Sequence, residues 1–101
     1  MKLYIDTSDN KKTIVGLDDF RLERPTGADK SQQVLILINQ ILKNHQKTFN
    51  DLTEIEVNTG PGSFTGLRVG VAVANALGWV LKIPVNGQKI NKDNIVLPKY
   101  K

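Results

Sequence analysis

Gly60-Pro-Gly-Ser-Phe-Thr-Gly-Leu-Arg-Val-Gly70 is the most informative segment of the chain. It lies between a short apolar run typical of a strand, Glu54 to Asn58, and a long apolar run typical of a helix, at about 65–81. A glycine-rich loop that opens into a helix leaves backbone N–H groups unpaired and lets the backbone approach another group closely. That group is either an anion or another part of a protein.

Composition indicates one small globular domain. The chain has 101 residues, of which 40% are hydrophobic and 24% are charged, enough for a single core. It has no cysteine, which excludes disulfides, thiolate chemistry and Cys-ligated metal sites, and we expect a cytoplasmic protein. The apolar run at 67–81 has about 15 residues, fewer than the roughly 20 that span a bilayer, and we expect no membrane contact.

Charge favours no specific partner. The formal net charge is +4, and ten of the 14 Lys and Arg residues lie at 11–30 or from residue 82 onward, without a dense run. This pattern indicates a mild positive field that helps an RNA-handling complex rather than a nucleic-acid-binding surface. Solubility is the simpler explanation of the same charges.

The order of elements follows from apolar periodicity and turn residues. The first half predicts three short strands joined by tight turns, hence an antiparallel meander, and then a helix that Asp29 or Ser31 caps and that ends near Asn44. The second half predicts a fourth strand, the 65–81 helix and a fifth extended piece at Pro84-Val85. The strands of the meander are Lys2 to Asp6, Lys12 to Leu17 and Phe20 to Glu23.

Both helices carry apolar residues that one sheet does not explain. In the first helix Ile36 lies almost opposite the apolar stripe that contains Leu37 and Ile38. The second helix is apolar nearly all round. Its one narrow polar sector contains Arg68 and Asn75, and Leu77 lies in one of its apolar sectors. Such a helix should be buried nearly all round, and we expect another chain to bury part of it.

A row of small residues, Gly66, Gly70 and Ala74, recurs every four positions in the second helix. Small residues at this spacing allow two backbones to approach closely. Either the row faces a partner chain, which we favour, or it packs tightly on the protein's own sheet.

These features together resemble the TsaB (YeaZ) family. The resemblance rests on Tyr4-Ile5-Asp6-Thr7-Ser8, the meander, the amphipathic helix and the 60–70 string, continues through Ala72 to Val85, and covers about residues 1–87. It implies an α/β fold: a single RNase H-like lobe of the actin, Hsp70 and sugar-kinase type, with a mixed five-stranded sheet and helices packed on it. We expect residues 1–87 to form this lobe and residues 88–101 to form a polar tail.

The resemblance also implies a function. Members of the family are non-catalytic partners in the synthesis of threonylcarbamoyladenosine in tRNA, and they normally have two lobes, where this chain has one. We expect either a natural single-lobe form or a truncated one.

Catalytic chemistry has little support in the residues. The only histidine is His45, so the His-x-x-x-His metal motif of the family's catalytic relatives is absent. Ser63 lacks the Gly-x-Ser-x-Gly pattern of a nucleophile, and residues 60–66 lack the Lys of a phosphate-binding loop. Positions near a phosphate or nucleotide would be Asp6, Thr7, Ser8, Gly62 and Ser63, although a hydrogen-bonded turn explains the first three more simply.

We therefore expect a non-catalytic, cofactor-free subunit that docks through its helices on a catalytic TsaD-like partner. A TsaE-like ATPase is a possible third component, tRNA is contacted indirectly, and the chain alone forms a homodimer. The expected contact residues are Ile36, Gly66, Arg68, Gly70, Ala74 and Leu77. The alternative is a homodimeric nucleotide-binding relic of the actin-like fold that uses Asp6 and the 60–66 loop.

Overall fold

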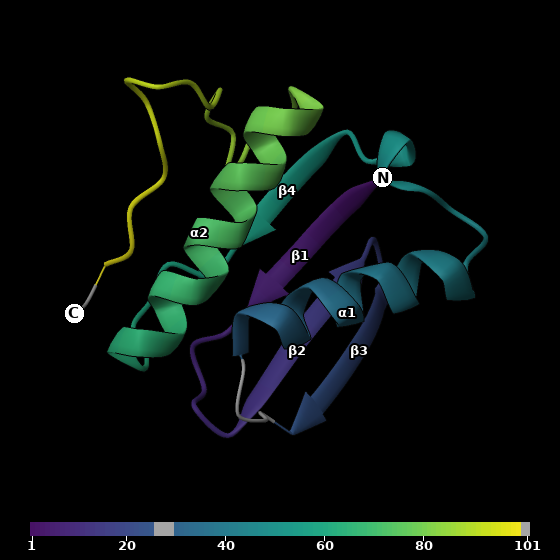
Figure 1. Cartoon of the computed structure of the whole chain (residues 1–101), viewed down its shortest axis with the longest axis horizontal. Helices are drawn as coiled ribbons and strands as arrows, with labels where there is room; N and C mark the ends of the chain where they lie inside the picture. Colours follow the sequence, from purple (N-terminus) through teal and green to yellow (C-terminus); the bar gives the residue numbers. More distant parts are fainter. Residues whose placement is uncertain (26–29, 100–101) are drawn as a thin grey trace.

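The computed structural model describes the backbone of residues 1–25 and 30–99. Side chains are described for the same residues except residues 30 and 31. The expected helix cap at Asp29 or Ser31 lies outside the described residues. The elements, in chain order, are β1 (Lys2–Asp6), β2 (Lys12–Leu17), β3 (Phe20–Pro25), α1 (Lys30–Asn44), a short 3-10 helix (Phe49–Asp51), β4 (Glu54–Val57) and α2 (Phe64–Leu81) (Figure 1).

The sheet is mixed, with strand order β3-β2-β1-β4. β2 is antiparallel to both β1 and β3, which confirms the predicted meander, and β1 is parallel to β4. Leu3 pairs with Leu17 and with Ile55, so alternate residues of neighbouring strands direct apolar side chains to one face. Both helices cover that face (Figure 1).

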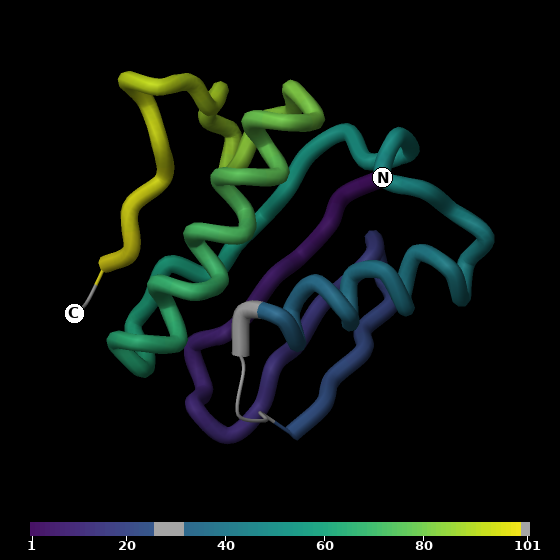
Figure 2. The backbone as a smooth tube through the Cα atoms, in the orientation of Figure 1, coloured from purple at the N-terminus to yellow at the C-terminus, as the bar shows by residue number. Residues whose placement is uncertain are grey.

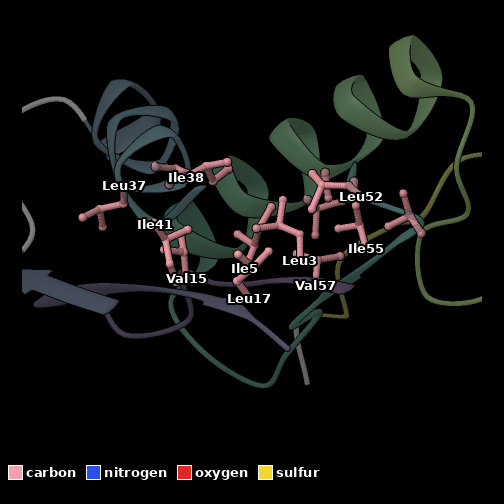
Figure 3. Close-up of a cluster of buried hydrophobic side chains, with 14 of the residues drawn as sticks. Leu3, Ile5, Val15, Leu17, Leu37, Ile38, Ile41, Leu52, Ile55 and Val57 are labelled. Carbon is pink, nitrogen blue, oxygen red and sulfur yellow. The ribbon is translucent and has the colours of Figure 1, made fainter. Parts of the chain in front are cut away.

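The core lies between this face and the two helices (Figure 3). Burying each Leu or Ile side chain there stabilises the fold by about 1.5–3 kcal/mol relative to leaving it exposed. Its fully buried large side chains include Leu3, Ile5, Val15 and Leu17 from the sheet and Val34, Leu37, Ile38 and Ile41 from α1.

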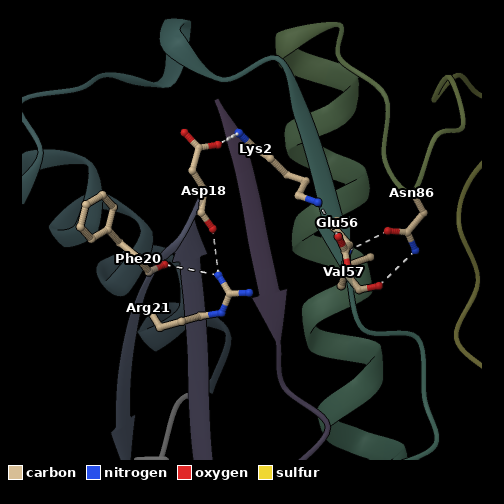
Figure 4. Close-up of polar contacts among 7 residues, drawn as sticks. All are labelled: Lys2, Asp18, Phe20, Arg21, Glu56, Val57 and Asn86. Atoms are coloured by element: carbon tan, nitrogen blue, oxygen red, sulfur yellow. Dashed lines mark hydrogen bonds and ion pairs between the residues drawn. The ribbon is translucent and has the colours of Figure 1, made fainter.

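The opposite face of the sheet is polar. The guanidinium of Arg21 lies 4.7 Å from the centroid of the Tyr4 ring, and Lys2 forms an ion pair with Glu56 at 2.9 Å. Figure 4 shows Lys2 and Arg21 above the strands, together with the bond from the Lys2 amide to Asp18. Because these polar and charged groups pair with one another, this face of the sheet is suited to contact with solvent.

The predicted fifth strand is not confirmed: among the described residues the sheet has four strands. Val85 pairs with β4 only through a single parallel bridge to Ile55. The chain then turns at Asn86, whose φ is +52°. The Asn86 side chain accepts a hydrogen bond from the Val57 amide at 2.8 Å and donates one to the Val57 carbonyl at 3.1 Å (Figure 4). This side chain therefore takes the two backbone bonds that the next residue of a fifth strand would make.

After this turn the chain returns along α2, on the side of α2 away from α1 (Figure 2). The side chains of Ile90 and Val96 are buried there. The Asn75 side chain of α2 holds Val96 by two hydrogen bonds, donated to the Val96 carbonyl at 2.8 Å and accepted from the Val96 amide at 3.0 Å.

Helix α2 has 18 residues, more than the apolar run predicted, and by length and composition alone it matches a membrane-spanning helix. One side of it, including Leu67, Val71 and Ala74, is buried within the protein. In all, 39% of the helix is buried, and its other side carries exposed apolar side chains such as Trp79 and Val80.

Candidate partner-binding surface

A backbone hydrogen bond joins the glycine-rich loop to the segment that follows β1. The Ser63 amide donates to the Ser8 carbonyl at 2.7 Å, and the Ser63 hydroxyl caps α2 by accepting from the Gly66 amide at 3.3 Å. A Cβ at Gly62 would lie 2.5 Å from the Cβ of Ser8, so only glycine fits there. The group that approaches this loop is therefore the protein's own backbone.

The buried Thr7 hydroxyl is inserted into the first turns of α2. It donates to the Gly66 carbonyl at 2.5 Å and accepts from the Gly70 amide at 3.1 Å. These two groups are four residues apart, the spacing that a helical hydrogen bond normally joins. A Cβ at Gly70 would collide with this hydroxyl, so the absence of a side chain lets the helix approach β1.

This geometry corrects one sequence-based expectation. Gly66, Gly70 and Ala74 are all buried within the protein, and the first two lie against Thr7 at the end of β1. The alternative that the row packs internally is the one that the structure supports.

The positions expected near a nucleotide, Asp6, Thr7, Ser8, Gly62 and Ser63, do meet at the end of β1. One Asp6 oxygen accepts bonds from the Ser8 amide and hydroxyl at 2.9 and 2.6 Å, and the other accepts from the Tyr4 hydroxyl at 3.1 Å. Asp6 is thus engaged in a local turn.

Burial and hydrogen bonds shift the two acids here in opposite directions. Burial alone would raise the pKa of Asp6, but the bonds donated to it, chiefly by Ser8, outweigh burial and lower that pKa. Burial and the nearby Asp6 charge raise the pKa of Tyr4 to about 12. In the described part of the chain, no three His, Cys, Asp or Glu residues gather as a metal site.

The outward sides of α1 and α2 each carry exposed apolar side chains. Among the exposed large hydrophobic side chains are Leu35 and Ile36 on α1, and Phe64, Trp79 and Val80 on α2. Ile36 is 57% exposed and Val80 is 71% exposed, so the fold leaves much of their apolar area in water. A hollow of about 410 Å³ lies on this side of α2, lined by Thr65, Arg68, Val69, Ala72 and Val73.

Arg68 is the only charged residue in α2. Its guanidinium lies 5.7 Å from the centroid of the Phe64 ring, and it has no ion-pair partner among the residues that the structure describes. Of the other expected contact residues, Ile36 is exposed, whereas Leu77 is partly buried against the core. Phe64, Leu35 and Val80 were not among the expected contact residues, although all three are exposed apolar side chains outside the buried stripes of their helices.

Comparison with known proteins points to one family. Residues 24–88 match the family described as TsaD: tRNA N6-adenosine threonylcarbamoyltransferase. The tRNA threonylcarbamoyladenosine biosynthesis protein TsaB of Bacillus subtilis is 36% identical over 88 residues, which cover 83% of this chain and 38% of that protein. A tRNA N6-adenosine threonylcarbamoyltransferase of Vesicomyosocius okutanii is 43% identical over 56 residues, 55% of this chain and 16% of that protein.

A solved structure shares the fold. YeaZ from Pseudomonas aeruginosa matches with a TM-score of 0.71 at 24% identity, over 83% of this chain and 41% of that one. The chain therefore spans well under half the length of each of these relatives.

Proposed function

The chain belongs to the TsaD family and, within it, to the TsaB (YeaZ) members, and from this premise we propose that it is a non-catalytic partner subunit in tRNA threonylcarbamoyladenosine biosynthesis. Its RNase H-like lobe docks on a catalytic TsaD-like subunit and stabilises the active arrangement of that subunit. We further propose that a TsaE-like ATPase joins the complex and that this chain contacts tRNA only indirectly. We also propose that the chain acts in the cytoplasm and forms a homodimer when it is alone.

The exposed apolar surface of α1 and α2 is the observation that carries the proposal. Large side chains such as Ile36 and Val80 would be buried by a partner, and burial of each contributes favourably to association. Arg68 lines the hollow on α2's outward side and has no acidic partner in the described part of the chain. We therefore place a partner carboxylate opposite Arg68, with Ile36 and the exposed edge of Leu77 as further contacts.

Reconstitution tests the proposal. The tRNA-modifying rate of a catalytic TsaD-like subunit from the same source is measured with and without this chain. We expect a large gain in rate on adding the chain, and equal rates in the two mixtures would rule out a partner role.

Substitution of Arg68 tests the proposed contact. Arg68→Ala should reduce the gain in rate, because truncating one side of a buried ion pair costs ~2–5 kcal/mol. Lys47→Ala is the matched control, since Lys47 is an exposed residue that lies beyond the end of α1. A gain that survives Arg68→Ala unchanged would remove Arg68 from the interface.

The alternative of a nucleotide-binding relic has weaker support, because the oxygens of Asp6 already accept bonds from Tyr4 and Ser8. A thermal shift distinguishes the two functions, since a ligand that binds the native state raises the unfolding temperature. We expect ATP to leave the unfolding temperature of the chain unchanged, and a concentration-dependent rise would favour the relic.

A further inference from the structure

Residues 94–99, named here the strap, lie extended along α2 on the side away from α1 (Figure 1). Three anchors hold the strap in place. The Asn94 side chain donates to the Lys89 carbonyl at 2.8 Å, Val96 forms two bonds with Asn75, and the Lys99 amide donates to the Thr59 carbonyl at 2.6 Å. The strap is therefore fixed at both ends and in the middle.

The strap presents apolar side chains to solvent. Successive residues of an extended chain point in opposite directions. Val96 points inward and is 6% exposed, whereas its neighbours Ile95 and Leu97 are 47% and 66% exposed. If the strap served only to cover α2, the buried side chain of Val96 would be sufficient. Polar residues would then be expected at the two outward positions, 95 and 97.

The apolar surface of the strap is continuous with that of α2. A hollow of about 510 Å³ between them is lined by Ile95, Val96, Leu97 and Pro98 together with Arg68, Val71, Ala72 and Asn75. The neighbouring hollow on the outward side of α2 is also lined by Arg68 and Ala72. The two hollows thus connect the strap with the outward side of α2, and Arg68 borders both of them.

We infer that the strap is part of the docking surface and that Ile95 and Leu97 pack against the same partner as the helices. This inference rests on the proposed function. The occupant is the catalytic subunit, through an apolar helix that carries a carboxylate for Arg68. The family match ends at residue 88, so the strap adds contacts that the matched region does not supply.

The test measures the Kd of the full chain for the purified catalytic subunit by titration calorimetry. Three variants are compared: a strap variant, Ile95→Ser with Leu97→Ser; a helix variant, Ile36→Ser with Val80→Ser; and the control Lys92→Ser, an exposed residue just before the strap. We expect the strap and helix variants each to bind at least about tenfold more weakly, because each removes two large apolar side chains from the contact. We expect the control to bind like the natural chain.

Each other outcome is decisive. Loss of affinity in the helix variant alone would overturn the strap inference and leave the proposed function standing. Failure of the unsubstituted chain to bind would refute the proposed function itself. Circular dichroism of each variant checks the fold, which should persist because each of the four substituted side chains is about half exposed or more. A strap variant that binds normally but no longer self-associates would assign the strap to a second copy of the chain and overturn the inference.

Discussion

Gly70→Ala tests whether the small residues of α2 serve the fold or a partner. In an exposed helix this change stabilises by about 1 kcal/mol, because alanine is the better helix former. Here the new Cβ would meet the Thr7 hydroxyl and would lie 3.4 Å from a methyl carbon of Ile5. Forced overlap in a packed core costs about 1–3 kcal/mol, and displacing the hydroxyl loses hydrogen bonds worth about 0.5–1.5 kcal/mol each.

The net expectation is a loss of about 2 kcal/mol in the free energy of unfolding, which lowers the melting temperature of a domain this size by roughly 8–16 °C. Urea denaturation of the purified chain measures it, with Ala76→Gly, an exposed change in the same helix, as the reference for helix propensity. In a Thr7→Ala background the same Gly70→Ala change should become neutral or stabilising, because the colliding hydroxyl is gone. A stabilising Gly70→Ala in the natural chain, with loss of partner binding, would refute the internal-packing argument.

Three further predictions concern single side chains. Asn86→Ala should destabilise more than Asn86→Gly in urea melts, because both lose the two bonds to Val57 but only alanine is also strained at a φ of +52°. Thr13→Val should stabilise by about 1 kcal/mol, because the buried Thr13 hydroxyl has no hydrogen-bond partner in the described structure; a lower unfolding temperature would contradict this. The pKa of Tyr4 rises from 10.0 to about 12, so its contribution to stability should be complete below pH 10 and lost as the pH rises through 12. Tyrosinate absorbance should show this late titration in the natural chain and not in Tyr4→Phe.

Most of the fold was predictable because it follows from local patterns. Alternation in β1 and β2, the tight turns between them and the stripe that includes Leu37 and Ile38 each indicate one element and its buried face. The fifth strand, which is not confirmed, was predicted because Val85 has the residue type of a strand. What ends the pairing there is a side chain, Asn86, that bonds to a backbone far away in sequence.

The candidate site was harder to predict for a related reason. A helical wheel shows that Gly70 shares a face with other small residues, but not whether that face meets a sheet or a partner. The deciding group is the hydroxyl of Thr7, which lies 63 positions away in sequence. Likewise, nothing local indicates that Ile95 and Leu97 would lie beside Arg68, because the return of the chain along α2 is a tertiary contact.

The pairing of Asn86 with β4 also has a consequence for chemical ageing. Asn86 precedes Gly87, and an asparagine before a glycine deamidates readily when the following backbone nitrogen reaches its side-chain carbonyl carbon. In the folded protein both polar atoms of that amide are bonded to Val57, which restrains the side chain at the edge of the sheet. Deamidation would replace the NH2 group that donates to the Val57 carbonyl with a negatively charged oxygen. Repulsion between the two oxygens would then open this edge of the sheet. The rate at which Asn86 deamidates therefore reports how often this edge opens, a local unfolding event with its own free energy.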